Sequence, residues 1–419
     1  MRKVLLISFF WPPSGKATIH WPLYMAKYLK KYDWQTSVLT VKEDTFSEKD
    51  ESLMKDVDSA MTIVRTRPND PFALYRRFIG KKQNEPLVPS ETISKKIDNW
   101  RYKLAIWIRM NLFVPDARIG WYLSAPKGGK KIIETEKPSV IITIGPPHST
   151  HLIGMKLSKR YKIPHVPVLI DPWVDIAYYR EFKRNIATVK LDNYFESSVL
   201  HHARAIIFVT KQTREHYILK YPDIENKSYV CYWGYNEESF ENVKKQPKNE
   251  ETLLHAGNIF DFQNPPNLWK ALHREILSGR KLRLKFAGTV SPVIRRAIQE
   301  AGLEPFSDFL GFLSYPDVVQ EMMNADYLLV CATEPRHVPG KLFEYMRTGN
   351  RIIAFGDDNE EVAQLLRVTN SGKIFPYSYH CNDIFERLSQ LTPNPEIAKQ
   401  FSREKIAEEL AQILSRSVS

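Results

Sequence analysis

The chain has 419 residues, which exceeds one ordinary hydrophobic core and leaves room for two or three domains. Hydrophobic residues make up 43 %, which excludes a disordered chain, and the net charge of +12 favours an anionic partner such as a nucleic acid, a membrane surface or a phosphorylated substrate. Three widely spaced cysteines favour a reducing compartment without disulfides or a zinc knuckle. No apolar run approaches the ~20 residues of a membrane span, and we expect no signal peptide.

The first 41 residues predict a βαβ unit. Residues 4–9 form a nearly continuous apolar run, typical of a strand that is buried on both faces. Two prolines and a glycine make residues 11–15 a loop, residues 23–31 follow as a helix, and residues 37–41 form the next strand. The loop therefore lies at the carboxyl end of a strand, where open α/β sheets bind ligands.

The same loop contains the sequence SGKAT, which invites comparison with a phosphate-binding P-loop. A Walker A motif needs a glycine five residues before its Gly-Lys pair and a Ser or Thr directly after it. Here Phe10 occupies the first position and Ala17 the last, so a P-loop nucleotidase is excluded. Gly15 is either a simple turn glycine or a residue that lets the backbone approach a ligand, and Lys16 either aids phosphate binding or faces water.

Further strand and helix signals alternate along the chain and predict a second α/β domain. The expected strands lie at residues 139–144, 166–170, 205–210, 252–257, 282–288, 327–330 and 351–355. A polar stretch at residues 236–251 indicates the boundary. We therefore expect an N-terminal domain over residues 1–238, a C-terminal domain over residues 239–394, and a final helix within residues 395–419.

Residues 42–135 interrupt the alternation and are basic and aromatic. Between Lys95 and Lys131 there are nine Lys or Arg and two Asp or Glu, so 9 − 2 = +7 of the net charge lies there, interleaved with aromatic side chains. This composition suits a segment at an anionic bilayer interface, although an ordinary helix with core aromatics and solvated cations has it too. Since the chain has no recognition-helix, zinc-finger or RNP-type pattern, we do not expect a nucleic-acid partner.

Residues 338–350 (VPGKLFEYMRTGN) carry the sharpest local signal. They predict a loop with a glycine, a short helix that starts near Gly340, and a glycine that ends the helix. Such a helix directs backbone N–H groups and its positive dipole end at a ligand, and Lys341 adds a charge that suits a diphosphate. Glu344, one turn later, would accept hydrogen bonds from ribose hydroxyls, unless it is simply solvated.

Together these segments resemble the GT-B glycosyltransferases, in particular the retaining family 4 and group 1 type and its bacterial surface-polysaccharide subset. The segments that carry the resemblance are 10–15, 28–40, 114–118, 145–149, 171–173, 256–258 and 341–345. The resemblance implies an α/β fold of two doubly wound Rossmann-like domains facing a central cleft, with the final helix within residues 395–419 returning to the N-terminal domain. It also implies a nucleotide-diphosphate sugar as donor substrate, bound mainly by the second domain, an acceptor on the first, retention at the anomeric carbon, and no cofactor or metal.

The resemblance also assigns site residues. The resemblance implies that His148 and Asp171 are catalytic. His148 would contact the donor sugar, and Asp171 would orient or deprotonate the acceptor hydroxyl. The expected donor-binding residues are Gly15, Gly257, Asn258, Gly288, Arg336, Pro339, Gly340, Lys341, Leu342 and Glu344. We expect His151 on a helix surface and Glu196 as a charge at a helix start.

The chain departs from the family pattern in its charges. The family's Arg and Lys after the first strand of the second domain are missing, because no cation lies between Gly257 and Lys270. Arg336 stands where the first of two glutamates is usual. Our hypothesis is that Arg336 and Lys341 replace the missing cations.

The sequence thus predicts a glycosyltransferase with a lipid-linked or polysaccharide acceptor. We expect it in the cytoplasm, with peripheral contact to anionic lipid on the inner face of the cytoplasmic membrane. Two alternatives stay open: a nucleotide-sugar epimerase of the same fold, and a degenerate, non-catalytic scaffold.

Overall fold

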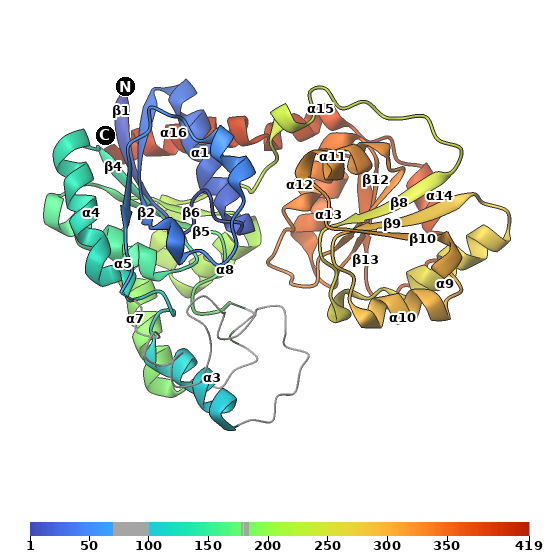
Figure 1. The fold of residues 1–419 in the computed structure, drawn as a ribbon, viewed down its shortest axis with the longest axis horizontal. Helices are drawn as coiled ribbons and strands as arrows, with labels where there is room; N and C mark the ends of the chain where they lie inside the picture. The colour runs from blue at the N-terminus through green and yellow to red at the C-terminus, as the bar shows by residue number, and fades with distance from the viewer. Residues whose placement is uncertain (70–99, 177–178, 180–183, 419) are drawn as a thin grey trace. The chain divides into compact units, whose positions relative to one another are not determined.

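The computed structural model describes residues 1–69, 100–176, 179 and 184–418, and the chain divides into two compact units. The first unit comprises residues 1–209, 213–231 and 406–419, and the second comprises residues 210–212 and 232–405. Each unit is built on one sheet, as Figure 1 shows. The prediction of two α/β domains is therefore confirmed.

The first unit has a seven-stranded sheet in the order β3-β2-β1-β4-β5-β6-β7, with all pairs parallel. Its strands are β1 (Arg2–Ile7), β2 (Trp34–Val41), β3 (Ile63–Thr66), β4 (Val140–Gly145), β5 (His165–Leu169), β6 (Ile206–Phe208) and β7 (Ser228–Val230). Its helices are α1 (His20–Leu29), α3 (Trp100–Leu112), α4 (Trp121–Glu136), α5 (Ser149–Tyr161), α7 (Ile186–His202), α8 (Lys211–Lys220) and α16 (Arg403–Val418). The strand order reverses between β1 and β4, which is the point where such sheets bind ligands.

Part of the stretch at residues 42–135 belongs to this sheet layer. β3 extends the sheet beyond β2, and α4 packs across β2 and β3. Trp121 at the start of α4 is fully buried, contacts Phe9 edge-on at 5.5 Å, and donates from its indole nitrogen to the Thr66 hydroxyl at 2.8 Å. This aromatic residue is therefore part of the core. The prediction for this stretch also covers residues 70–99, which lie outside the described residues.

The second unit has a six-stranded sheet in the order β10-β9-β8-β11-β12-β13, again with all pairs parallel. Its strands are β8 (Glu251–Ala256), β9 (Leu282–Ala287), β10 (Ser307–Gly311), β11 (Tyr327–Cys331), β12 (Arg351–Phe355) and β13 (Gly372–Phe375). Its helices are α9 (Pro266–Leu277), α10 (Pro292–Glu300), α11 (Tyr315–Asn324), α12 (Lys341–Thr348), α13 (Glu360–Val368), α14 (Ile384–Ser389) and α15 (Pro395–Ala398). The reversal lies between β8 and β11.

Both faces of this second sheet are buried, which explains its continuous apolar strands. Along β11, Leu328 and Val330 pack into a core on one face, together with residues of α11, α12 and α13. Leu329 and Cys331 pack into a second core on the other face, with residues of α9, α10 and α14. Alternate side chains thus enter different cores, and none of them faces water.

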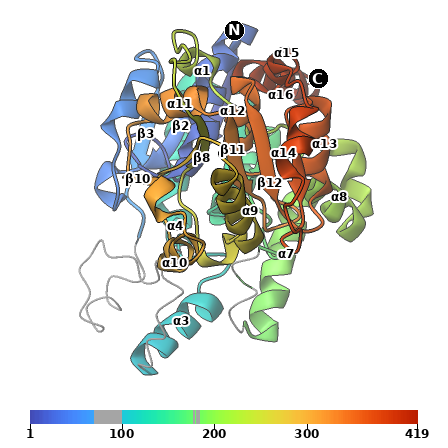
Figure 2. The ribbon, with the colours of Figure 1, turned by 90° about the vertical axis from the view of Figure 1, so that its right-hand side faces the viewer.

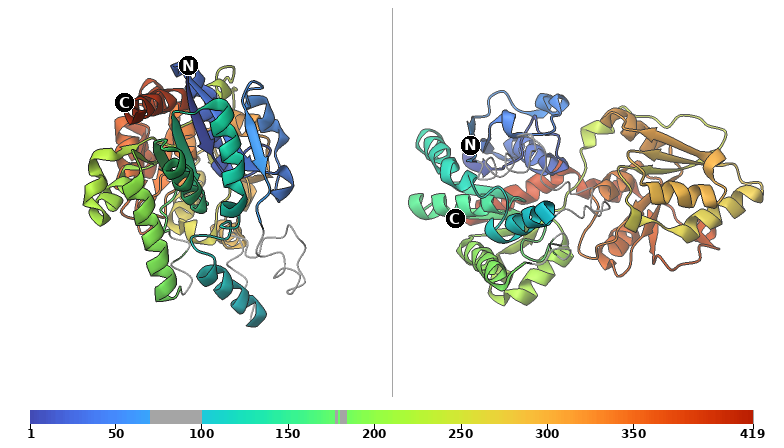
Figure 3. Two further views of the ribbon diagram at one scale, coloured as in Figure 1. Left: turned by 90° about the vertical axis from the view of Figure 1, so that its left-hand side faces the viewer. Right: turned by 60° about the horizontal axis from the view of Figure 1, so that its bottom comes forward.

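The end of the chain differs from the single helix expected within residues 395–419. It forms α15, a short 3-10 turn at Lys399–Phe401, and then α16. Ser402, in extended conformation, separates that turn from α16. Among the described residues, no helix has the length and apolar character that a membrane span requires. Figure 2 and Figure 3 show α3 and the N-terminal part of α7 extending away from the sheet of the first unit.

Candidate functional site

The predicted donor-binding residues of the second unit lie at the carboxyl edge of its sheet. Gly257 directly follows β8, Gly288 follows β9, and the loop after β11 leads into α12. Because these strands are parallel and adjacent, their carboxyl ends share one edge. The fold therefore brings this set of residues together.

Helix α12 begins and ends as its sequence predicts. It starts at Lys341, directly after Gly340, and ends at Thr348, directly before Gly349, whose φ of 72° is left-handed. In its first turn, Leu342 N–H donates to the Pro339 carbonyl at 2.9 Å. One turn later, the Tyr345 hydroxyl accepts a 2.8 Å hydrogen bond from the Ala256 N–H, which fixes the helix to the end of β8.

Gly340 is required by close packing. A Cβ at this position would lie 2.7 Å from two ring atoms of Trp233, which is closer than side chains approach one another. The start of α12 is thus wedged against an indole ring. Any larger residue at position 340 would shift the helix start and its backbone N–H groups.

Lys341 places its ammonium beside the backbone of Gly257. A Cβ on Gly257 would lie 3.0 Å from Lys341 Nζ, and Gly257 has a φ of +97°. Lys341 Nζ lies 3.2 Å from His255 Nε2, while His255 Nδ1 lies 3.1 Å from the Leu329 carbonyl. If Nδ1–H donates to that carbonyl, Nε2 is left to accept from Lys341, so the partner of the ammonium is a neutral imidazole.

The electrostatics of this pair follow from burial. Desolvation lowers the pKa of Lys341 to about 8, against weaker opposite effects of Cys331 and Glu344. Desolvation, together with the Lys341 charge, holds the pKa of His255 well below its ordinary value. At neutral pH the site therefore presents one desolvated ammonium, which an anionic ligand would stabilise.

Glu344 lies one turn beyond Lys341 on α12. Its Oε1 accepts a 2.8 Å hydrogen bond from the Tyr315 hydroxyl. Burial raises the pKa of Glu344, while Arg403, Tyr315 and Lys341 oppose that shift. The carboxylate is thus held in place by a tyrosine and has further lone pairs that could accept from a ligand hydroxyl.

The loop after β8 has no Lys or Arg of its own between Gly257 and Asn264 and is held by amide side chains. Asn258 Oδ1 accepts from Thr289 N–H at 3.0 Å, and Gln263 Oε1 accepts from Phe260 N–H at 3.0 Å. Gly288 approaches the same loop so closely that a Cβ there would lie 2.6 Å from the Gly257 carbonyl oxygen. Asn258 and Gly288 therefore shape the loop through local packing and hydrogen bonds.

Arg336 has a carboxylate partner of its own. Its Nε donates to Glu334 Oε1 at 3.2 Å, and the Arg336 side chain is largely buried. Its charge is thus balanced within the loop that precedes α12. The structure gives Lys341 a neutral partner and Arg336 an acidic one, so the two cations of our hypothesis are not equivalent.

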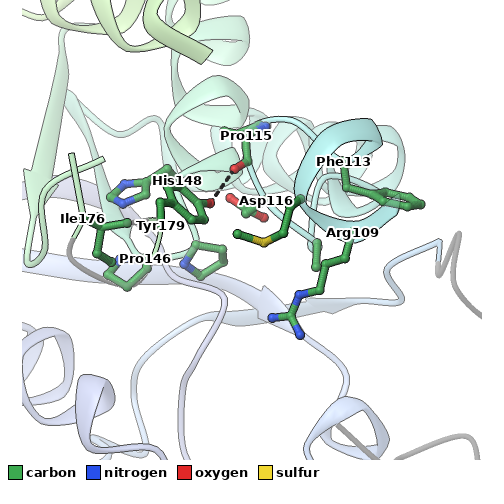
Figure 4. Close-up of a pocket in the computed structure, with 11 residues that line it drawn as sticks. Arg109, Phe113, Pro115, Asp116, Pro146, His148, Ile176 and Tyr179 are labelled. Carbon is green, nitrogen blue, oxygen red and sulfur yellow. Dashed lines mark hydrogen bonds between the residues drawn. The ribbon is translucent and has the colours of Figure 1, made fainter. Parts of the chain in front are cut away.

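In the first unit, His148 lines a cavity of about 160 Å³ at the carboxyl end of β4 (Figure 4). Its walls are formed by Pro146 and Pro147 after β4, by the segment around Asp116, by Tyr179 and by α3. The residues of α3 that line it are Arg109 and Met110, followed by Phe113 just beyond the helix. The cavity combines an apolar wall with a few polar groups, as binding sites for organic ligands do.

The His148 ring is 4 % exposed and stacks on Trp173, with ring centroids 5.1 Å apart and planes inclined by 8°. Neither ring nitrogen makes a hydrogen bond of good geometry with the described residues. Burial lowers the pKa of His148 to about 3, against a weak opposite effect of the Pro172 backbone. His148 is therefore a neutral imidazole with capacity to bond a ligand hydroxyl.

Asp116 lines the same cavity, and its contacts were not predicted from the sequence. Its carboxylate accepts from Ser149 N–H at 2.7 Å and from the Ser149 hydroxyl at 3.0 Å, so it holds the start of α5. Burial raises the pKa of Asp116 against these hydrogen bonds. The Tyr179 hydroxyl donates to the Pro115 carbonyl at 3.0 Å and closes the same wall. Because the partners in these hydrogen bonds lie more than 30 residues apart in the sequence, no local sequence pattern predicts them.

The other two predicted residues of the first unit lie elsewhere. Asp171 follows β5 and is partly buried, but it is not among the residues that line the cavity. Gly15 N–H donates to the Glu48 carbonyl at 2.9 Å, and Lys16 Nζ pairs with Glu48 Oε2 at 3.0 Å. The Gly15 N–H and the Lys16 ammonium are thus already engaged by the segment around Glu48.

His151 does not lie on a helix surface, and that expectation was wrong. It is fully buried and shares the Thr143 hydroxyl with His165, each ring nitrogen lying 2.8 Å from Oγ1. Burial lowers the pKa of both histidines, that of His165 to about 3. The side chains fill the space between β4, α5 and β5, where an apolar residue would ordinarily pack.

Glu196 was expected as a charge at a helix start, which was also wrong. It lies within α7, is fully buried, and accepts four hydrogen bonds. The donors are Val174 N–H at 3.1 Å, Tyr217 at 2.7 Å, Lys220 at 2.6 Å and Tyr221 at 2.9 Å. Tyr217 OH also accepts from Trp173 N–H at 2.8 Å. Glu196 thus fixes the segment that carries Trp173, on which His148 stacks.

Within the described ranges, no three His, Cys, Asp or Glu side chains gather as metal ligands would. A scan against models of protein families finds no match. A search among curated protein sequences finds none either. Similarity to known proteins is seen in the solved structures.

Two of these structures are Anabaena HepE in complex with UDP and glucose, and the apo form of the lipopolysaccharide outer core galactosyltransferase WaaB. HepE is 14 % identical with a TM-score of 0.61 and covers 99 % of this chain and 100 % of its own. WaaB is 12 % identical with a TM-score of 0.61 and covers 99 % of each chain. A putative UDP-N-acetylglucosamine 2-epimerase from Listeria monocytogenes is 11 % identical with a TM-score of 0.57, covering 99 % of this chain and 96 % of its own.

These similarities span nearly the whole chain at low identity, so they establish the fold. Two doubly wound parallel sheets of seven and six strands, matched over 99 % of the chain, define the GT-B fold class. The predicted fold class is confirmed. Activity has to be argued from the site.

Proposed function

We propose that the protein is a glycosyltransferase that moves a sugar from a nucleotide-diphosphate sugar to a lipid-linked or polysaccharide acceptor. The observation that carries this proposal is the Lys341 ammonium, which lies beside the Gly257 backbone at the N-terminus of α12 with a neutral imidazole as its partner. A diphosphate there would gain both the ammonium charge and the positive end of the helix dipole.

The donor would occupy the second unit. Its diphosphate would lie at Gly257, Gly340 and Lys341, and its ribose hydroxyls would donate to Glu344. UDP is the first nucleotide to test, because HepE is a structural neighbour seen with UDP and glucose. Arg336, already paired with Glu334, would contribute less to the diphosphate than Lys341 does.

The acceptor would occupy the first unit. In this proposal His148 forms a hydrogen bond to a sugar hydroxyl as a neutral group, and Asp171 orients or deprotonates the acceptor hydroxyl. Transfer proceeds with retention and without a metal, so the chain's residues neutralise the departing diphosphate and hold the acceptor in place. The enzyme acts at the inner face of the cytoplasmic membrane.

Two alternatives have specific support. An epimerase of the same fold is among the structural neighbours and would convert its sugar nucleotide without any acceptor. A scaffold would fit the loop after β8, where Asn258 and Gln263 stand without cations. Acceptor dependence separates a transferase from an epimerase, and donor turnover separates an enzyme from a scaffold.

The first experiment is a thermal-shift panel of UDP, GDP, ADP, dTDP and CMP with their sugars. A ligand at about one hundred times its dissociation constant should stabilise the protein by roughly 2.7 kcal/mol. Glu344→Ala should reduce that stabilisation, because the ribose loses an acceptor. The matched control is Glu360→Ala on α13, whose side chain is 71 % exposed in a surface pair with Arg367.

The outcomes are distinct. One nucleotide that stabilises the wild type and Glu360→Ala but not Glu344→Ala would support the donor site and identify the base. Stabilisation that Glu344→Ala does not alter would place the nucleotide elsewhere. An absence of stabilisation by every nucleotide would favour the scaffold.

A further inference from the structure

Helices α3 and α7 of the first unit expose large hydrophobic side chains. On α3, Leu104, Trp107 and Leu112 are 41 %, 48 % and 63 % exposed. On α7, Ile186 and Tyr194 are 75 % and 66 % exposed. A single exposed hydrophobic residue needs no explanation, but exposed groups on two neighbouring helices do.

The two helices are joined to each other. Asn111 near the end of α3 accepts from Asn185 N–H at 2.6 Å, and its carbonyl accepts from the Thr188 hydroxyl at 2.8 Å. These bonds tie the C-terminal end of α3 to the N-terminal end of α7. The exposed residues therefore belong to one projecting part of the first unit (Figure 2).

Charge on these helices is one-sided. The sequence of α3 contains Arg and Lys but no Asp or Glu. The two acids of α7, Asp192 and Glu196, are both fully buried and paired, with Arg184 and Lys220. The exposed surface of α7 up to Tyr194 thus carries Lys190 but no carboxylate. Apolar and cationic side chains without acids suit an anionic bilayer surface.

Helix α3 has two functional faces. Its residues Arg109 and Met110 line the cavity beside His148, whereas Leu104, Trp107 and Leu112 are exposed. At 100° per residue, Leu104, Trp107 and Leu112 span an arc of about 140°. The cavity-lining Arg109 and Met110 lie outside that arc, each about 60° from the nearest exposed residue, so the two faces adjoin without overlapping. A surface bound by the outer face would lie one helix away from the cavity.

We propose that the outer faces of α3 and α7 bind an anionic lipid bilayer, and that the acceptor is an amphiphile embedded in that bilayer whose polar head enters the cavity beside His148. The second part rests on the proposed glycosyltransferase function. The first part does not, because vesicle binding requires neither donor nor turnover. Trp107 and Tyr194 would lie at the level of the lipid headgroups, where amphipathic aromatic rings are favoured.

The test is flotation of the full chain with vesicles of phosphatidylcholine containing about 30 % phosphatidylglycerol, at low salt. The wild type should float with these vesicles and bind pure phosphatidylcholine more weakly. The double variant Trp107→Ser, Leu112→Ser should lose at least about tenfold in partitioning. The matched control is Leu219→Ser on α8, an 83 % exposed leucine of the same unit.

UDP-induced stabilisation of the same variants separates the two proposals, since substitutions on α3 should not alter nucleotide binding in the second unit. Normal thermal unfolding of the double variant would show that it folds. The membrane proposal is wrong if the wild type does not float, if the double variant floats as well as the wild type, or if Leu219→Ser loses as much. It is also wrong if the wild type is a dimer that the double variant converts to monomer without vesicle binding, because the faces would then contact a second copy.

Discussion

Replacing Lys341 by Met should make the free protein more stable and its nucleotide binding weaker. The ammonium is desolvated and its hydrogen-bond partner is the neutral His255, so the folded state pays for the charge without a ligand. The pKa of Lys341 falls from its ordinary 10.5 to about 8. At 1.36 kcal/mol per pKa unit, the ionised side chain costs the folded state up to about 3 kcal/mol below pH 8.

The pH dependence has a definite sign. Since the folded pKa lies below the unfolded one, the unfolded chain binds the extra proton between about pH 8 and 10.5, and stability rises with pH across that window. A bound diphosphate favours the ammonium and restores the higher pKa. Nucleotide affinity should therefore be highest below pH 8 and fall as the pH rises through that value.

The magnitude of the binding loss follows from the contact. A hydrogen bond to a charged group contributes about 1.5–3 kcal/mol, so Lys341→Met should weaken UDP binding by roughly 10- to 150-fold. Calorimetric titration with UDP and urea unfolding, both at pH 7, measure the two effects. The control is Lys270→Met, because Lys270 is an exposed lysine on α9 and is the first cation after Gly257 in the sequence.

The reasoning would be refuted by either of two results. If Lys341→Met destabilised the free protein at pH 7, the ammonium would be stabilised by a partner in the free protein, and its charge would not lower the free energy of unfolding. If UDP bound this variant within about twofold of the wild type, the diphosphate would not lie at Lys341.

Three further predictions concern the first unit. Substitution His148→Ala should lower donor turnover at least about tenfold while leaving UDP affinity unchanged, since the imidazole lines the cavity of the first unit and our proposal places UDP in the second. An equal loss of UDP affinity would contradict the assignment of His148 to the sugar or the acceptor. Substitution Glu196→Gln should cost about 2 kcal/mol in urea unfolding, because the buried carboxylate accepts from Tyr217, Tyr221 and Lys220, and only Lys220 has a second carboxylate, Asp175. Glu215→Gln, at an exposed position on α8, should cost little, and a loss below about 1 kcal/mol for Glu196→Gln would contradict the buried network. Finally, burial lowers the pKa of His148 and His165 from 6.5 to about 3, so the unfolded chain binds more protons than the folded chain between these pH values. Each histidine should therefore lower the free energy of unfolding by about 2 kcal/mol at pH 5, measured as a fall in the urea midpoint. A urea midpoint that stays constant from pH 7 to pH 5 would contradict the two lowered pKa values.

The sequence predicted the central strands well because burial on both faces leaves a continuous apolar run. Strands β11 and β12 are of this kind. Edge strands such as β3 and β10 are short and only half-buried, so their residues are mixed and gave no such run. The ends of α12 were predictable too, because two glycines that bound a short helix are a local signal.

What the sequence could not supply were contacts between distant residues. Glu196 was predicted as a charge at a helix start, and nothing near it in the sequence indicates its contacts with Lys220 and Tyr217. In the same way, Lys341 was identified as a candidate cation, but its neutral partner His255 lies 86 residues away. The charged residues could therefore be identified from the sequence, but the hydrogen-bond partners that determine their roles could not.

Those partners separate the buried polar groups into two kinds. Glu196 is a buried charge whose hydrogen bonds are all supplied by the fold, so it can be assigned to the scaffold that holds Trp173. Lys341 has a neutral imidazole as its hydrogen-bond partner, and the buried His148 makes no hydrogen bond of good geometry with the described residues. Folding alone does not favour either arrangement, because each leaves desolvation of a polar group uncompensated. An anion at Lys341 in the second unit and a ligand hydroxyl at His148 in the first unit would each compensate one of these groups, so we propose these two residues, rather than the better-bonded Glu196 or the paired Arg336, as ligand contacts.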